Sequence, residues 1–304
     1  MSTTTAPAPR WGTASANPLS TDKVIITCAL TGVLANREQC PAIPYTPEEI
    51  ADEAKRAYDA GAAAVHIHAR NDDGSPTFAP EVFGRIRDEV RKRCPIILNF
   101  STGSLDEDTS LQERTIREVQ PEFAALNMGT MNYAKYSRRR KEFVFDMVFP
   151  NSFGKISRLL QTMRDSGVRP ELECFDTGHT ASIWPLLDQG VLEMPVQFSF
   201  IVGVLGGIPV SPDALMLQAR QIPEGSTWEV IGIGRSQWRL VATALVLGGN
   251  IRVGLEDNFY LPEGTMAQSN GELVARAARL SRDIGREPAT VEEARQMLQV
   301  PATG

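Results

Sequence analysis

The chain has 304 residues, of which 42% are hydrophobic and 22% are charged. This composition is ordinary for a globular protein and excludes the collagen-like and disordered classes. The 31 basic residues are outnumbered by 37 acidic ones, a balance that argues against a nucleic-acid-binding protein.

The first residues differ in composition from the rest of the chain. They are rich in Ser, Thr, Ala and Pro and lack the continuous apolar segment of a secretory signal. We therefore expect a mobile tail over residues 1–22, a single domain over residues 23–304 and a cytoplasmic location. No apolar run approaches the roughly 20 residues that span a bilayer, so we expect no membrane partner. The four cysteines are widely spaced and predict neither a disulfide scaffold nor a Cys-only metal site.

Short apolar segments rich in strand-forming residues recur along the chain. Their near-continuous hydrophobicity is typical of parallel strands that are covered on both faces. In chain order, the eight predicted strands are Val24–Leu30, Ala64–Arg70, Ile96–Thr102, Phe123–Thr130, Glu171–Phe175, Val196–Gly203, Trp228–Arg235 and Ile251–Glu256.

The segments between the strands carry signals of helices. Thr46-Pro47-Glu48-Glu49 is a capping box with proline at the first helical position, and Gly61 marks the end of that helix. A second capping box opens a short helix at Thr290 near the C-terminus. The other predicted helices are Pro80–Arg93, Ser152–Ser166, Trp238–Leu247 and Leu273–Ile284.

Eight β/α units within about 260 residues, without an internal linker, favour a (β/α)8 TIM barrel over a doubly wound sheet. The chemistry of such barrels lies at the carboxyl ends of the strands and in the loops that follow them. Polar residues at those positions are therefore the candidates for the site.

His66 and His68 lie at the end of the second predicted strand. They are two residues apart, so both side chains point to the same face. Two imidazoles on one face can chelate a divalent metal such as Zn²⁺. The alternative is a pair of hydrogen-bonded histidines in the core.

An acidic pair, Glu256 and Asp257, ends the eighth predicted strand. In a closed barrel this strand lies beside the first, so Glu256 could reach a metal held by His66 and His68. Two histidines and one carboxylate form the ligand set of a catalytic metal centre. The alternative is that the two carboxylates pair with Arg252 or Arg235 as surface ions.

Other strand ends are polar as well. The candidates there are Asn99, Ser101, Thr102 and Gly103 after the third strand, Asn127, Thr130 and Asn132 after the fourth, and Glu173 and Asp176 after the fifth.

Three further features have two interpretations each. Gly234 and Arg235 at a helix start could bind phosphate through free backbone N–H groups, although a tight turn explains the glycine equally well. His179 could be a metal ligand or an acid, but a single loop histidine is usually neither. The basic run over residues 138–141 is interpreted as solvated surface.

Together, these strand ends resemble the β-keto acid cleavage enzymes. The resemblance extends in order from residue 23 to about residue 298. It is carried by Thr31-Gly32, Pro41-x-x-Pro44-x-Thr46-Pro47-Glu48-Glu49, His66-Ile67-His68-x-Arg70-x-Asp72-Asp73-Gly74, Ser101-Thr102-Gly103, Leu126-Asn127-x-Gly129-Thr130, Gly232-Ile233-Gly234-Arg235, Arg252-x-Gly254-x-Glu256-Asp257-Asn258 and Ser269-Asn270-x-x-Leu273-Val274.

The resemblance implies a zinc-dependent barrel that combines a β-keto acid with acetyl-CoA to give acetoacetate and a new acyl-CoA. It implies that His66, His68 and Glu256 hold zinc, which agrees with the ligand set expected from strand direction. It further implies catalytic roles for Arg252, Asp257 and Glu173, contact between Ser101 and the substrate carboxylate, and a homotetramer. Thr102, Gly103, Asn127 and Thr130 complete the expected substrate site, and Gly234 and Arg235 the site for the CoA phosphates.

The sequence departs from the family pattern at two positions. Leu34 stands where a glutamate of the aminohexanoate-cleaving member meets the amino group of its substrate, and Ser104 replaces a second glycine. Both positions are expected to affect the choice of substrate. A neutral or alkyl β-keto acid is therefore expected, with an acidic substrate that pairs with Arg37 as the second choice.

Two other functions stay open at this stage. One is a different metal-dependent barrel lyase, aldolase or hydrolase that works without acetyl-CoA. The other is a barrel that has lost its activity and serves in binding or assembly. The presence of all the expected metal-binding and catalytic residues argues against the second alternative.

Overall fold

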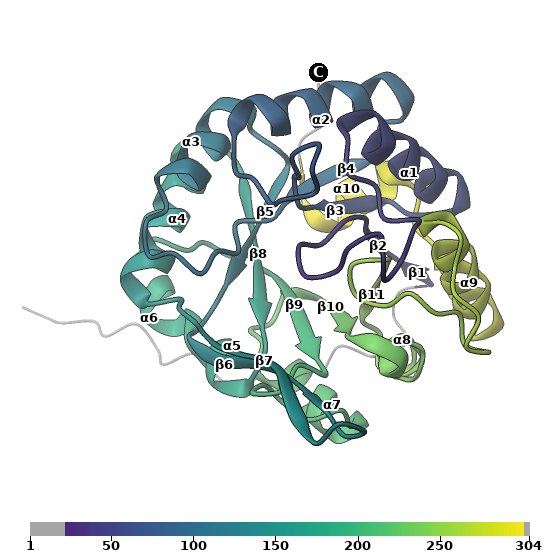
Figure 1. The fold of residues 1–304 in the computed structure, drawn as a ribbon. Helices are drawn as coiled ribbons and strands as arrows, with labels where there is room; N and C mark the ends of the chain where they lie inside the picture. Colours follow the sequence, from purple (N-terminus) through teal and green to yellow (C-terminus); the bar gives the residue numbers. More distant parts are fainter. Residues whose placement is uncertain (1–21, 301–304) are drawn as a thin grey trace, which may run out of the picture.

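The computed structural model describes residues 22–300. Within this range eight parallel strands form a closed barrel in the order β10-β11-β2-β3-β4-β5-β8-β9. The strands are β2 (Ile26–Ala29), β3 (Ala64–Ile67), β4 (Ile97–Phe100), β5 (Phe123–Asn127), β8 (Arg169–Cys174), β9 (Gln197–Val202), β10 (Thr227–Gly232) and β11 (Asn250–Val253). The predicted (β/α)8 barrel is therefore confirmed, and Figure 1 shows its helices arranged around the strands.

The helices of the barrel follow the predicted segments closely where the caps are clear. Thr46 and Glu49 form the predicted capping box at the start of the first helix, and Gly61 ends it in the left-handed conformation. The helices are α1 (Pro47–Ala60), α2 (Pro80–Arg93), α3 (Ser110–Val119), α4 (Phe153–Asp165), α5 (Thr177–Ala181), α6 (Ile183–Asp188), α7 (Pro212–Gln221), α8 (Gln237–Val246), α9 (Asn270–Asp283) and α10 (Val291–Leu298), with a 3-10 turn at Gly234–Ser236.

Two parts of the fold differ from the predicted elements. The first predicted strand is split, because Lys23–Val24 (β1) leaves the barrel to pair with Glu287–Pro288 (β12). The fourth is shorter than predicted and is followed by an antiparallel hairpin of β6 (Met131–Ser137) and β7 (Glu142–Phe149). The basic run of residues 138–141 forms the turn of this hairpin. All four side chains of the run are exposed, in agreement with the predicted solvated surface.

The barrel interior has an apolar floor and a polar upper part. Ile25, Ala64, Ile97 and Phe123 pack against the C-terminal helix α10, which covers the amino-terminal end of the barrel. Above this floor many of the buried interior side chains are polar or charged, and they lead to the carboxyl ends of the strands: Thr27, His66, Asn99, Glu171, Glu173, Ser199, Glu229 and Arg252. A closed floor leaves the carboxyl end of the barrel as the place for chemistry.

Residues 1–21 of the expected tail lie outside the described range, so the division at residue 22 stays a prediction. Between residues 22 and 300, no helix is both long enough and apolar enough to cross a membrane.

Candidate active site

His66 and His68 lie on the same face at the carboxyl end of β3. His66 is buried, with 1% of its side chain exposed, whereas His68 is 13% exposed at the mouth of the barrel. Thr31 fixes the position of His68. Its hydroxyl donates a hydrogen bond of 2.7 Å to the His68 carbonyl and accepts one of 2.9 Å from the His68 N–H. The ends of β2 and β3 are thereby held together.

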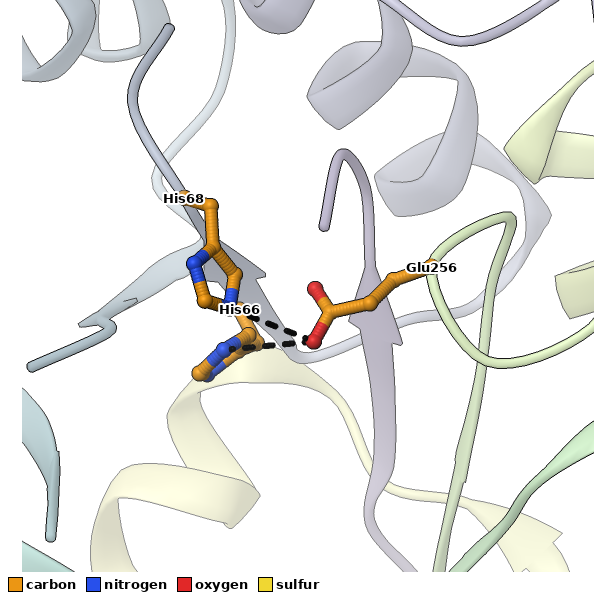
Figure 2. Close-up of side chains that lie close together, drawn as sticks. All are labelled: His66, His68 and Glu256. Atoms are coloured by element: carbon orange, nitrogen blue, oxygen red, sulfur yellow. Dashed lines mark ion pairs between the residues drawn. The ribbon is translucent and has the colours of Figure 1, made fainter. Parts of the chain in front are cut away.

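Glu256 reaches the two histidines from the loop after β11. Gly254 starts this loop with a φ of +147°, and a Cβ at that position would overlap the backbone of Ala29. Glycine is therefore required for the close approach of the loop to β2. Oε1 of Glu256 lies 3.7 Å from Nε2 of His66 and 3.4 Å from Nε2 of His68, and Figure 2 shows the carboxylate directed between the rings.

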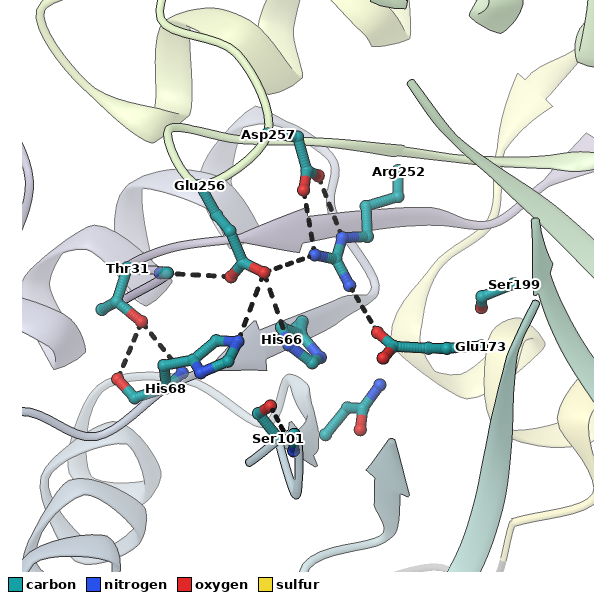
Figure 3. A network of polar contacts seen from close by, with 12 residues as sticks. Thr31, His66, His68, Ser101, Glu173, Ser199, Arg252, Glu256 and Asp257 are labelled. Carbon is teal, nitrogen blue, oxygen red and sulfur yellow. Dashed lines mark hydrogen bonds and ion pairs between the residues drawn. The ribbon is translucent and has the colours of Figure 1, made fainter. Parts of the chain in front are cut away.

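Arg252 connects the acidic residues beneath this triad of His66, His68 and Glu256. Its guanidinium is almost fully buried and binds both carboxylate oxygens of Asp257 at 3.0 Å. Its Nη2 also lies 2.8 Å from Glu256 Oε1, and its Nη1 lies 3.5 Å from Glu173 Oε1. Figure 3 shows this network, in which one cation faces three carboxylates. Glu256 and Asp257 do pair with Arg252, but in the barrel interior and not on the surface.

The protonation states follow from burial and from these neighbours. Burial lowers the pKa of His66 well below its usual range, and the charge of Arg252 lowers it further. Burial alone would raise the pKa of Glu256, but His68, Arg252 and His66 hold it well below its ordinary value. The triad therefore presents a neutral imidazole and an ionised carboxylate, the forms that bind metals.

The pKa values of the two other carboxylates that contact Arg252 are shifted in the opposite direction, upward. Burial raises the pKa of Asp257 to about 6, although Arg252 opposes the shift. Burial, reinforced by the charge of Glu171, raises the pKa of Glu173 to about 8. At pH 7 Asp257 is accordingly the more readily ionised of the two.

The expected substrate residues of β4 and β5 lie near the triad at the same end of the barrel. Ser101, Thr102 and Asn127 are buried. The Ser101 hydroxyl accepts a hydrogen bond of 3.3 Å from the Gly103 N–H, which leaves its own proton available to a ligand. The Thr102 hydroxyl, in contrast, donates to the carbonyl of Ala125 and so braces the adjacent strand.

Other expected residues lie further from the triad or make local contacts. Thr130 is exposed, and its hydroxyl accepts from the Asn151 N–H at the base of the hairpin. The Ser104 hydroxyl accepts from the Asp106 N–H in its own loop. Leu34 is 59% exposed in the loop after β2.

The turn after β10 is tied to the acidic loop. The Gly234 N–H donates to the Asp257 carbonyl at 2.8 Å. The exposed side chain of Arg235 lies over the ring of Tyr260, 4.4 Å from its centre.

His179 and Asp176 are part of the short helix α5. Asp176 caps its amino terminus, and Nδ1 of His179 accepts from the Phe175 N–H at 3.3 Å. Among the described residues, His179 is in neither group whose ligand atoms lie close enough to share a metal ion. Its interpretation as a structural histidine is therefore favoured.

Several residues that shape the site were not singled out from the sequence. Asn270 accepts from the Leu255 N–H, donates to the Leu30 carbonyl and binds the buried Glu53, which anchors the acidic loop. Arg70 donates to the carbonyls of Gly32 and Ala35 in the loop after β2. Asn270 and Arg70 occur in the motifs that carry the family resemblance, so the signal was present without a role attached to it.

Comparison with known proteins identifies the family of the chain. A profile of the beta-keto acid cleavage enzyme family matches residues 23–300. The 3-keto-5-aminohexanoate cleavage enzyme of Fusobacterium nucleatum is 41% identical over 280 residues, which cover 92% of this chain and 98% of that protein. The 3,5-dioxohexanoate:acetyl-CoA acetone transferase of Paraburkholderia graminis is 34% identical, with 91% of this chain and 96% of the relative covered.

Solved structures support the same fold. The apo structure of ObcA superimposes with a TM-score of 0.71 at 22% identity, over 86% of this chain and 66% of ObcA. At this level of identity the likeness concerns the fold alone. The family profile spans residues 23–300, a range that includes both histidines, Arg252 and Glu256. The two relatives each cover more than nine-tenths of this chain. The chain therefore belongs to the β-keto acid cleavage enzyme family.

Proposed function

We propose that this protein transfers acyl groups between a β-keto acid and acetyl-CoA, at a zinc centre held by His66, His68 and Glu256. The convergence of both Nε2 atoms on Oε1 of Glu256 carries the proposal. Relatives named for acetyl-CoA-dependent reactions of 3,5-dioxohexanoate and of 3-oxoadipate support the co-substrate. The products would be acetoacetate and a new acyl-CoA.

The three donor atoms fit zinc in both chemistry and spacing. Two imidazole nitrogens and one carboxylate oxygen are a ligand set of catalytic zinc sites that leaves a position open for substrate. Donors about 2.0 Å from a tetrahedral ion are about 3.3 Å apart. The 3.4 and 3.7 Å separations from the Glu256 oxygen are close to that value. Zinc bound there would supply a Lewis acid for the keto and carboxylate oxygens of the substrate.

Asp257 is the proposed base that removes the proton from the α-carbon of the β-keto acid. Both of its oxygens are oriented by Arg252, and it follows the proposed ligand Glu256 directly in the chain. The resulting carbanion would attack the acetyl thioester, the CoA thiolate would then attack the other acyl carbon, and cleavage of the carbon–carbon bond would release acetoacetate. Glu173, on the opposite side of Arg252, is the alternative base.

The substrate carboxylate would be oriented by the loop after β4. The Ser101 hydroxyl and the backbone of this loop are the donors we propose there, with Gly103 and Asn127 beside them. Thr102 would contribute through its backbone, since its hydroxyl is bound to Ala125. Ser104 and Thr130 are assigned to the rim of the substrate site.

Leu34 is the proposed determinant of substrate charge. Its exposed apolar side chain offers no counter-charge to an ammonium group, which favours a neutral or alkyl β-keto acid. An acidic substrate is less well supported, because Arg37 is already paired with Glu49 and packs on the ring of Tyr45.

The phosphates of acetyl-CoA are assigned to Arg235 and the turn at Gly234, which could be checked by a higher KM for acetyl-CoA in Arg235→Ala. A homotetramer, testable by sedimentation velocity, and a cytoplasmic location complete the proposal. The four cysteines are buried and unpaired, as is usual in a reducing compartment.

Metal analysis tests the centre directly. Because the chain has only three histidines, His179 provides a matched control. The purified protein should hold about one zinc per chain, and the double variant His66→Ala/His68→Ala should lose both zinc and activity. His179→Ala should keep its zinc. Wild-type zinc content in the double variant would contradict the assignment.

A further inference from the structure

A second carboxylate lies beneath His66, on the side away from Glu256. Glu171 precedes Glu173 by two residues on β8, so both side chains point into the barrel. The side chain of Glu171 is 2% exposed. It accepts hydrogen bonds from the Asn99 amide and the Ser199 hydroxyl. These two donors hold the carboxylate in one orientation.

The ring of His66 is fixed on one side only. Its Nε2 faces Glu256, whereas its Nδ1 is buried and, among the described residues, has no hydrogen-bond partner. Oε2 of Glu171 lies 4.0 Å from this Nδ1. A neutral imidazole that offers Nε2 to a metal carries its proton on Nδ1. A buried N–H would then face a buried carboxylate at 4.0 Å, and a small rotation of either side chain would be needed to close the hydrogen bond.

We propose that Glu171 is a positioning residue for the metal centre, which accepts a hydrogen bond from Nδ1–H of His66 and thereby fixes the tautomer and orientation of that ring. The inference rests on the proposed function, because His66 is a ligand only if the metal centre exists. Histidine ligands commonly donate their second N–H to a carboxylate, and loss of that partner typically costs 10–100-fold in metal affinity.

Glu173 is the competing acceptor, because it lies in the same group of potential ligand atoms as His66 and Glu171. It is engaged from the other side by Arg252 Nη1 at 3.5 Å. Glu171 makes no ion pair with Arg252, and its oxygens are held by neutral donors instead. Glu171 is therefore the carboxylate that we assign as the hydrogen-bond acceptor for Nδ1–H of His66.

Glu229 provides a matched control for a variant at Glu171. It is also a fully buried glutamate inside the barrel, and it shares the hydroxyl of Ser199 with Glu171. Its other hydrogen-bond partners are Thr27 and Glu171 itself, and no ion pair of the described residues joins it to His66. Glu171→Gln and Glu229→Gln each replace a buried carboxylate of this pair by an amide of the same size, but only the first removes the carboxylate that faces Nδ1 of His66.

The experiment uses the full chain and zinc alone. Zinc affinity is measured by competition with a chelator for wild type, Glu171→Gln and Glu229→Gln, and folding is monitored by circular dichroism. We expect affinity to fall 10–100-fold in Glu171→Gln and to stay within about twofold of wild type in Glu229→Gln. Equal losses in both variants, or wild-type affinity in Glu171→Gln, would overturn the inference.

A measurement on the unmutated protein gives an independent test. With ¹⁵N-labelled histidine, the three ring systems can be resolved by NMR in the zinc-loaded protein. His66 should carry its proton on Nδ1, with a downfield N–H resonance that moves upfield in Glu171→Gln and not in Glu229→Gln. A zinc-bound Nδ1, or a shift only in Glu173→Gln, would overturn the role of Glu171. If wild type binds no zinc, the metal centre itself is wrong and this inference fails with it.

Discussion

Arg252 is the residue on which the electrostatics of the site depend. It is almost fully buried. Among the described residues it forms ion pairs with three carboxylates, those of Glu173, Glu256 and Asp257. A buried guanidinium is tolerated when carboxylates surround it, and in turn it orients them. One residue thus links the proposed zinc ligand Glu256 with both candidate bases.

Substitution of the two candidate bases separates their roles. Asp257→Asn should keep zinc and slow turnover by roughly 100-fold or more, because a general base is removed while the shape is retained. Glu173→Gln should affect turnover less. Steady-state kinetics with metal analysis provides the measurement. Near-normal turnover in Asp257→Asn, together with an inactive Glu173→Gln, would assign the base to Glu173.

The preference of the enzyme for neutral or charged substrates should depend on a single residue, Leu34, in the loop after β2. Wild type is expected to have a higher kcat/KM for an unsubstituted β-keto acid such as 3-oxohexanoate than for its 5-amino analogue. The amino group would meet an apolar side chain that offers no counter-charge, so it would lose hydration without a partner in return. Leu34→Glu should shift the preference toward the amino substrate. A wild-type preference for the amino compound would refute the role of Leu34.

At the scale of elements, the acidic loop after β11 depends on one glycine. Gly254 and Gly264 both have positive φ, but only a Cβ at Gly254 would meet other atoms, namely the backbone of Ala29. Gly264→Ala should therefore cost about 1 kcal/mol of unfolding free energy, and Gly254→Ala more than about 3 kcal/mol. Denaturant titration measures both costs. Zinc affinity should fall only in Gly254→Ala, and equal effects of the two substitutions would contradict this account of the loop.

The barrel strands and the capped helices could be predicted because their signals are local. Continuous apolar runs mark the eight strands, and Thr46 and Thr290 form the two capping boxes that the sequence indicates. The β6–β7 hairpin could not be predicted in the same way. In β6 buried and exposed residues are mixed, and in β7 no residue is fully buried, because the hairpin packs beside the barrel mouth and not inside a sheet. The helix α3 lacks a side-chain cap, and its start carried no clear signal.

The candidate site was predictable where strand direction alone decides the geometry. His66, His68 and Glu256 come together because β3, β2 and β11 are neighbours in the closed barrel, as expected. Glu171 and Glu229 were not predicted, because they lie within their strands, below the strand ends where the chemistry of a barrel is expected. Only the assembled interior places two glutamates around one serine.

At the scale of the whole molecule, the polar interior makes stability depend on pH. Burial, reinforced by Glu171, raises the pKa of Glu229 well above 4.5, so the folded protein keeps a proton there that the unfolded chain releases. Above pH 4.5 this difference favours the unfolded state increasingly, until pH passes the pKa of the folded protein. The buried carboxyl group therefore reduces stability at neutral pH.

Glu229→Gln should remove this dependence. Its unfolding free energy relative to wild type should increase between about pH 4.5 and neutrality, by up to about 1.4 kcal/mol per pH unit. Denaturant titrations at several pH values provide the measurement, with the exposed Glu263→Gln as the control. A constant difference between Glu229→Gln and wild type across this range would contradict the shared burial of the two glutamates.

The proposed reaction forms one carbon–carbon bond to the acetyl group of acetyl-CoA and breaks another in the β-keto acid. The measurement that tests it most directly follows ¹³C from doubly labelled acetyl-CoA during turnover of an unlabelled β-keto acid. The account predicts acetoacetate labelled in its acetyl carbons, an unlabelled new acyl-CoA and no turnover without acetyl-CoA. Unlabelled acetoacetate, or cleavage of the β-keto acid in the absence of acetyl-CoA, would contradict the account and indicate a lyase or hydrolase built on the same barrel.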